Sequence, residues 1–204
     1  MRYLIVCGGK IDKEFGLNEI KTDGIDAIIA ADSGMDFLYE NGVTPDIIVG
    51  DFDSATTKAL EFFERKGQTE IHRLNPIKDD TDTEYAIRLA IREGARSIVL
   101  LGATGSRIDH VLGNISLLGI GLESGTDISI IDTNNRIRMA DKPVTIEKSA
   151  QYGRFVSLIA VTDDNEVSLR GFKYPVTDYS FDRFTSLGIS NEIVDDHALI
   201  DIHR

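Results

Sequence analysis

The sequence is short of cysteine and of basic residues, and each shortage excludes a class of protein. Its 204 residues contain one cysteine, Cys7, which excludes a disulfide within the chain and a zinc site made of several cysteines. Lysine and arginine number 22 against 34 aspartate and glutamate, a formal net charge of −12. Because binding to a phosphate backbone needs clustered basic side chains, nucleic acid is an unfavourable partner. The lone cysteine favours a reducing, cytoplasmic location.

Long apolar runs are also missing. No stretch approaches the roughly 20 apolar residues of a membrane span, and the first nine residues are too briefly apolar for a secretory signal. We therefore expect a soluble protein with no membrane partner. With 42% hydrophobic and 27% charged residues, the composition is that of a globular chain long enough for one large domain or two small ones.

The first 125 residues alternate short β-branched runs with helical patterns, which is typical of a parallel sheet with crossover helices. The predicted strands cover residues 3–7, 27–31, 47–50, 70–74 and 97–101. The predicted helices cover residues 56–66, 84–93 and 109–123. This pattern predicts a Rossmann-like α/β domain over residues 1–125.

Beyond Gly125 the pattern contains strands separated by turn residues and no convincing helix. The predicted strands cover residues 127–132, 145–148, 154–162, 166–172 and 193–202. We expect residues 126–204 to form a small antiparallel β-sandwich domain, with the seam between the domains near residues 125 to 140.

Acidic residues gather where the predicted parallel strands end, at the sheet edge where ligands bind in open α/β folds. Converging carboxylates repel one another unless a cation joins them, and Mg²⁺ prefers oxygen ligands and often shares them with substrate phosphates. We therefore expect a magnesium site at this edge of the sheet. The acids after the second, third and fourth strands are Asp32, Asp51, Asp53, Asp79, Asp80, Asp82 and Glu84.

The segment Asp51-Phe52-Asp53 is the first candidate metal clamp. If it is extended, its alternate spacing points both carboxylates the same way and turns Phe52 into the core. An Asp-x-Asp at a strand end is also compatible with a turn or a helix cap.

The segment Thr81-Asp82-Thr83-Glu84 fits a capping box, with Thr81 as the N-cap and Glu84 reaching back. Four acids in six positions exceed what one cap requires, so we assign Glu84 to structure and Asp82 to the metal site. Asp79 and Asp80 are either supporting or merely solvated.

A glycine-rich turn after the fifth strand, from Gly102 to Arg107, offers backbone N–H groups and a helix amino terminus to an anion. Arg107 adds a bidentate phosphate contact, although an ordinary turn with a surface arginine has the same pattern. The chain contains neither a P-loop nor a Gly-x-Gly-x-x-Gly motif. His110, beside Asp109, is either a proton carrier or structural.

Taken together, these motifs resemble the motif series of the thiamine pyrophosphokinase family. The resemblance rests on Ala31-Asp32-Ser33-Gly34, Gly50-Asp51-Phe52-Asp53-Ser54, Asp80-Thr81-Asp82 and the segment from Gly102 to Asn114, and continues in Gly171 to Pro175 and Ser186 to Glu192. Two departures are mild: Ser33 and Ser106 stand where the family usually has glycine.

The resemblance implies transfer of the pyrophosphoryl group of ATP to the hydroxyl of thiamine, giving thiamine diphosphate and AMP. It implies Mg²⁺ on Asp51, Asp53 and Asp82, with Asp32 or Asp109 orienting the hydroxyl or a metal-bound water. The implied catalytic residues are Asp32, Asp51, Asp53, Asp82, Arg107 and Asp109. The implied ATP-binding residues are Ser33, Gly34, Thr104, Gly105 and Arg107.

The resemblance also implies that thiamine binds Tyr174, Ser190 and Asn191 in a site completed by the second subunit of a homodimer. Ordinary β-domain packing and turn chemistry explain those three residues equally well. Two other functions stay open at this point: another Mg²⁺-dependent small-molecule kinase that releases ADP, and a non-catalytic sensor of nucleotide or thiamine.

Overall fold

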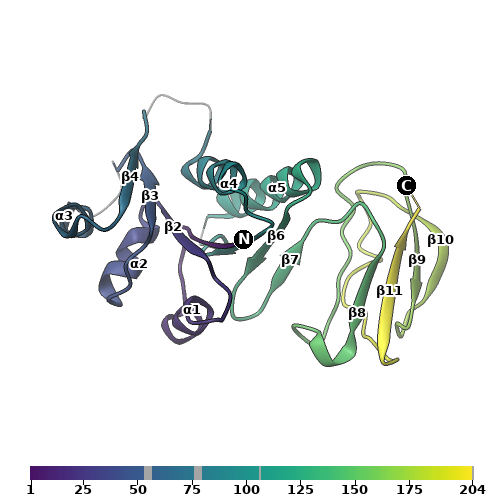
Figure 1. The fold of residues 1–204 in the computed structure, drawn as a ribbon. Coiled ribbons are helices and arrows are strands. Elements are labelled where there is room, and N and C mark those ends of the chain that lie inside the picture. The colour runs from purple at the N-terminus through teal and green to yellow at the C-terminus, as the bar shows by residue number, and fades with distance from the viewer. Residues whose placement is uncertain (53–56, 76–79, 106, 204) are drawn as a thin grey trace. The chain divides into compact units, whose positions relative to one another are not determined.

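A computed structural model describes residues 1–52, 57–75, 80–105 and 107–203 of the chain. The chain forms two compact units, Met1–Met139 and Ala140–Arg204 (Figure 1). The division falls within the predicted seam, at its far end. The segment after residue 125 therefore still contributes to the first unit.

The first unit is built on one seven-stranded sheet with the order β4-β3-β2-β1-β5-β6-β7. Its first six strands pair in parallel, and β7 is antiparallel to β6. The first five predicted strands are confirmed to within one residue, and residues 127–132 form β6 of this sheet. The strands are β1 Arg2–Val6, β2 Ala27–Ala31, β3 Ile47–Gly50, β4 Glu70–Arg73, β5 Ser97–Leu101, β6 Asp127–Ile131 and β7 Arg136–Arg138.

Helices join the parallel strands. The three predicted helices are confirmed as α3 Thr57–Lys66, α4 Asp82–Arg92 and α5 Ile108–Ser124. The sequence pattern missed two shorter ones, α1 Lys13–Ile20 and α2 Gly34–Glu40. Both carry a glycine and run for at most eight residues, so their local helix propensity is weak and packing against the sheet decides their conformation.

Two apolar layers enclose the sheet, and β1 contributes to both. Tyr3 and Ile5 pack in the layer that contains buried residues of α4 and α5. Leu4 and Val6 pack in the opposite layer, with buried residues of α2 and α3. Figure 1 shows α4 and α5 on one side of the sheet and α1 and α2 on the other. A strand covered on both faces is hydrophobic along its covered length, as Tyr3 to Val6 are; only the first residue of β1, Arg2, is charged and partly exposed.

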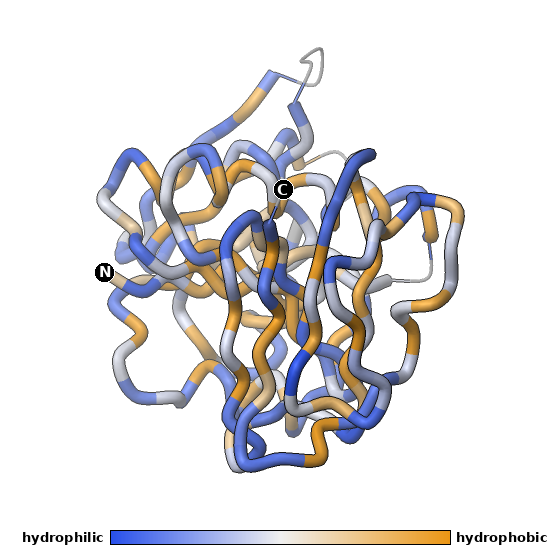
Figure 2. The backbone as a smooth tube through the Cα atoms, turned by 90° about the vertical axis from the view of Figure 1, so that its right-hand side faces the viewer, coloured by the Kyte–Doolittle hydropathy of each residue, from blue (hydrophilic) through white to orange (hydrophobic). Residues whose placement is uncertain are grey.

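The second unit is a four-stranded antiparallel sheet with the order β10-β9-β11-β8. Its strands are β8 Val144–Glu147, β9 Asn165–Arg170, β10 Val176–Phe181 and β11 His197–Ile202, and the 3₁₀ helix η1 covers Lys148–Ala150. In Figure 2 these strands face the viewer and carry polar and apolar stretches in alternation. An α/β domain followed by a small antiparallel β domain, as predicted, is confirmed.

The predicted strand over residues 154–162 is wrong. Only an isolated bridge joins Val156 to Asn191, although the N–H of Leu158 also donates to the carbonyl of Gly188 at 2.9 Å. Val156, Leu158 and Ala160 still pack against the core of this unit. The alternation of buried and exposed side chains is therefore real, but it belongs to an extended segment that lies beside residues 187–191 without forming a strand. The sequence also missed strand β10.

Candidate active site

Asp32 lies directly after β2, in a backbone conformation that most residues avoid. Its φ is +48°, which aspartate tolerates better than most other residues. The tertiary structure fixes it there, because its N–H donates to the carbonyl of Val49 at 2.8 Å and its carbonyl accepts from the N–H of Met35 at 3.2 Å. The first of these bonds ties Asp32 to the neighbouring strand β3.

Three carboxylates converge at this edge of the sheet. Asp32 follows β2, Asp51 follows β3, and Asp82 opens α4 after β4. One carboxylate oxygen from each lies within 4.8 Å of the others, and all three side chains are partly buried. Residues up to 50 positions apart meet here because the carboxyl ends of parallel strands lie at one edge of the sheet.

The donor set fits a magnesium ion. At an effective dielectric constant of about 20, two carboxylates about 4 Å apart repel by about 4 kcal/mol, so three in one place favour a bound cation. The ligands are all oxygens, without histidine or cysteine, and that set suits Mg²⁺ rather than zinc or copper.

The cluster differs from the predicted metal set in one member. Asp51 and Asp82 are brought together as predicted, whereas Asp53 lies outside the described residues. Asp32, predicted only to orient the acceptor or a water, joins the cluster instead. Phe52 has a φ of +62°, so the chain is not extended there and the argument from alternate spacing fails. Its ring does pack into the core, as predicted.

The start of α4 confirms Thr81 as the predicted N-cap, but the Glu84 side chain pairs forward along the helix rather than reaching back. The Thr81 hydroxyl accepts from the N–H of Glu84 at 3.2 Å. The Glu84 carboxylate accepts from Arg88 one turn later, at 2.7 and 2.9 Å. Glu84 therefore has a structural role. Asp82, in the same first turn of α4, is the residue that belongs to the carboxylate cluster. Asp80 is exposed, and Asp79 lies outside the described residues.

Two glycines outside the predicted site line the same edge. The strand order reverses between β1 and β5, which is the usual ligand crevice of an open α/β sheet. There the N–H of Gly9 donates to the carbonyl of Gly102 at 2.9 Å, and a Cβ on Gly9 would lie 2.3 Å from that oxygen. The Gly8-Gly9 pair directly after the first predicted strand was the available signal.

Four of the five predicted ATP-binding residues lie directly after β2 or β5, at the same edge of the sheet. A Cβ on Gly8 would lie 2.2 Å from Oγ of Ser33, so the loops after β1 and β2 touch. Gly34 is buried, and a Cβ there would lie 1.9 Å from the carbonyl of Val6, so its role is close packing. Thr104 and Gly105 are partly exposed in the loop after β5.

Arg107 and Asp109 form an ion pair at the start of α5. Nη2 of Arg107 donates to Oδ2 of Asp109 at 2.7 Å, and the two side chains are 67% and 65% exposed. The hydrogen bond from Arg107 lowers the pKa of Asp109, and a bond from the N–H of His110 at 3.0 Å adds to it. Asp109 is thus favoured as an anion, and Arg107 is paired with it beside the glycine loop.

The three residues predicted to bind thiamine lie in the second unit and differ in exposure. Asn191 is 6% exposed, and its amide accepts from the N–H of Tyr174 at 3.1 Å and donates to the carbonyl of Tyr174 at 2.8 Å. Tyr174 is 61% exposed. Ser190 is exposed with a φ of +60°, and its N–H donates to Ser157. Asn191 therefore shapes the loop that presents the Tyr174 ring.

Comparison with known proteins covers both units. The family model "Thiamin pyrophosphokinase, catalytic domain" matches residues 21–130, and "Thiamin pyrophosphokinase, vitamin B1 binding domain" matches residues 143–203. Thiamine pyrophosphokinase of Bacillus subtilis (strain 168) is 36% identical over 168 residues, which are 81% of this chain and 78% of that protein.

Solved structures show the same likeness. The crystal structure of thiamine pyrophosphokinase from Bacillus subtilis has a TM-score of 0.87 at 31% identity, covering 99% of this chain and 94% of that one. The structure of thiamin pyrophosphokinase from Geobacillus thermodenitrificans has a TM-score of 0.83 at 31% identity, covering 99% and 93%.

Proposed function

The chain belongs to the thiamin pyrophosphokinase family, and from this membership we infer that it transfers the pyrophosphoryl group of ATP to thiamine. The reaction gives thiamine diphosphate and AMP. The hydroxyl oxygen of thiamine forms a bond to the β-phosphorus, the bond from that phosphorus to the bridging α,β-oxygen breaks, and AMP leaves with the electron pair. The hydroxyl proton passes to a base.

Asp32, Asp51 and Asp82 are the residues that would hold Mg²⁺. The observation that carries this proposal is the approach of their oxygens to within 4.8 Å. Asp53 stays a predicted fourth contributor. Bound there, Mg²⁺ would neutralise the phosphate oxygens, which is the main requirement of phosphoryl-type transfer.

The phosphates are proposed to bind along the crevice between β1 and β5. The loops that hold Gly8, Gly9 and Gly105 are small-residue turns that let a phosphate approach the backbone. Arg107 supplies a guanidinium at the start of α5, where it is paired with Asp109. Thr104 lies in the same loop as Gly105, and we propose that it also lines the phosphate site.

The base is proposed to be one of the two aspartates named from sequence. Arg107 lowers the pKa of Asp109, so that carboxylate is a weak proton acceptor and suits an orienting role. Asp32 lies among the carboxylates at the reaction centre. Asp32 would accept the proton, directly or through a water, on the carboxylate oxygen that does not hold Mg²⁺.

Thiamine binding is proposed for the second unit, whose matching family model is described as vitamin B1 binding. Tyr174 offers an exposed ring for stacking, and a cationic thiazolium suits such a face. Ser190 is a second exposed candidate. Asn191 acts through the Tyr174 loop, because its side-chain amide is already engaged there.

A homodimer is proposed from an apolar surface on the same unit, which we call the 155–189 face. Its members lie outward on two neighbouring segments and are unusually exposed for large apolar side chains. They are Phe155 (52%), Ile159 (73%), Val161 (52%), Leu187 (55%) and Ile189 (46%). A second copy of this chain is the partner that covers a self-complementary apolar patch. The family resemblance supports the same partner.

We propose a cytoplasmic location. Among the described residues, no helix is long and apolar enough to cross a membrane. The single buried thiol, Cys7, is consistent with the cytoplasm that we propose.

The decisive experiment supplies the purified protein with ATP, Mg²⁺ and thiamine and identifies the nucleotide released. We expect AMP and thiamine diphosphate in equal amounts. Release of ADP would instead identify a one-phosphate kinase, and binding without turnover would identify a sensor; neither alternative is favoured by the family membership.

A further inference from the structure

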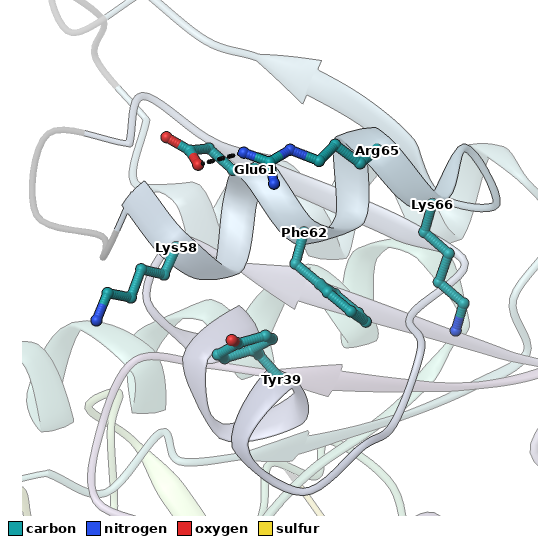
Figure 3. A pocket seen from close by; sticks show the side chains of 6 residues that line it. All are labelled: Tyr39, Lys58, Glu61, Phe62, Arg65 and Lys66. Atoms are coloured by element: carbon teal, nitrogen blue, oxygen red, sulfur yellow. Dashed lines mark hydrogen bonds and ion pairs between the residues drawn. The ribbon is translucent and has the colours of Figure 1, made fainter.

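A second hollow lies away from the carboxylate cluster, between α2 and α3 (Figure 3). It has a volume of about 560 Å³. Its wall consists of two aromatic rings, three basic side chains and one acid: Tyr39, Phe62, Lys58, Arg65, Lys66 and Glu61. None of these residues belongs to the proposed catalytic machinery.

The aromatic floor of this hollow is exposed and consists of rings in contact. Tyr39 and Phe62 are 37% and 45% exposed and contact each other edge to face, with ring centroids 5.2 Å apart. Phe63 is fully buried beneath them, with centroids 5.3 Å from Phe62 and 6.4 Å from Tyr39. Because Phe63 already fills the core position, the two outer rings have no apolar site to turn into.

The charge around the rings is positive in a chain whose net charge is −12. Glu61 is the one acid of the wall, and it is paired with Arg65 at 3.0 Å. Figure 3 shows Lys58 and Lys66 on opposite sides of the two rings, with Glu61 and Arg65 directed away from them. Lys66 is held in place, since Nζ donates to the hydroxyl of Thr44 and lies 5.8 Å from the Phe62 ring centroid.

We propose that this hollow binds a flat aromatic anion of the mononucleotide class, with the base against Tyr39 and Phe62 and the phosphate at Lys66 or Lys58. Stacking on an exposed ring is sequence-tolerant and favourable for any heterocyclic base. A nucleoside monophosphate carries nearly two negative charges at neutral pH, which suits ammonium groups that no carboxylate in the wall neutralises. A cationic ring such as thiazolium is repelled by the same lysines.

This site differs from the active site in one testable way. The nucleotide at the carboxylate cluster depends on a divalent cation, whereas the hollow supplies its own positive charge. Binding at the hollow therefore persists in EDTA and weakens with added salt.

The test is an NMR titration of the full chain with AMP in EDTA, following the ring resonances of Tyr39 and Phe62. We expect saturable shifts, and we expect Lys66→Gln and Lys58→Gln each to raise the dissociation constant roughly five- to tenfold. Lys21 is an exposed lysine outside the hollow, so Lys21→Gln is the matched control and should leave the dissociation constant unchanged. Asp82→Asn also leaves this binding unchanged, so failure of the proposed function does not affect the result.

Inorganic phosphate and pyrophosphate are titrated in parallel to separate ring recognition from simple anion binding. If either shifts the rings at the same concentration as AMP, the nucleotide class is wrong. Absence of shifts with AMP, or equal affinity in the lysine variants, overturns the site itself. The pocket variants are expected to keep normal turnover of ATP and thiamine.

Discussion

The hydroxyl of Thr104 donates a 2.7 Å hydrogen bond to the carboxylate of Asp132, which ties the loop after β5 to the end of β6. Asp132 also accepts from the backbone N–H groups of Asn134 and Asn135, at 2.8 and 2.7 Å. Burial alone would raise the pKa of Asp132, but these bonds outweigh it and lower the pKa. The proposed phosphate loop is thus anchored by an ionised side chain from a neighbouring strand.

Asp132→Ala is expected to destabilise the protein by about 1–3 kcal/mol, because several donors lose their acceptor. With a lowered folded-state pKa, Asp132 contributes stability that is present above its unfolded pKa of about 3.9 and is lost as pH falls through the folded value. Denaturant titrations between about pH 5 and pH 3 check the sign. Asp132→Asn should flatten this acid dependence, and an unchanged slope would contradict the assignment.

Asp82→Asn is expected to lower turnover at least about 100-fold while the protein stays folded, because one of three oxygens in the cluster loses its charge. Mg²⁺ affinity, measured by calorimetry, falls with it. Asp80→Asn is the matched control, an exposed carboxylate two residues earlier. If both variants lost the same turnover, or if neither lost any, membership of the cluster would not matter for activity. Asp53→Asn is expected to behave like Asp82→Asn.

Burial raises the pKa of the Cys7 thiol to about 11, although a hydrogen bond from Thr83 acts in the opposite direction. Its stability contribution is complete below the unfolded pKa of about 8.5 and is lost between that value and about 11, because only the unfolded chain ionises there. The loss should approach about 1.4 kcal/mol per pH unit. Cys7→Ala should lose this alkaline slope, and in the folded wild type the thiol should not react with a thiol reagent at pH 8.

In the Tyr174 loop, Asn191 is proposed to hold the backbone in shape and Tyr174 to contact thiamine. Tyr174→Ala is expected to raise KM for thiamine without loss of stability, because the ring is 61% exposed. Asn191→Ala is expected to raise KM and to cost about 1–3 kcal/mol, since two backbone groups lose a buried partner. Steady-state kinetics and thermal unfolding of both variants distinguish the roles. Normal KM in Tyr174→Ala would remove that ring from the thiamine site.

Ile159→Lys is expected to convert a dimer to a monomer, because it places a charge within the 155–189 face, where Ile159 is 73% exposed in a single chain. Sedimentation velocity measures the change in mass. Thr177→Lys, an exposed position on β10, is the control and should stay dimeric. If the wild type sediments as a monomer, the face has another partner.

Much of the site was predictable because its residues follow strands whose pattern is unmistakable. Asp51 and Asp82 could be predicted to lie together, since parallel strands end at one edge of the sheet. Asp32 was assigned to the site but not to the metal, because the +48° turn that directs its carboxylate to the others depends on the bond to Val49. The Gly8-Gly9 pair was passed over because its contact with Gly102 is purely tertiary.

The sequence by itself determined the alternation of strands and helices, the Thr81 cap of α4 and the family, because each of these is written in short motifs whose own residues are adjacent in the chain. Only the tertiary structure decided that β6 joins the first sheet, that residues 154–162 do not form a ladder, and that α1 and α2 are helices. Those outcomes depend on which neighbour offers a backbone partner or an apolar surface, and residues far apart in sequence supply both.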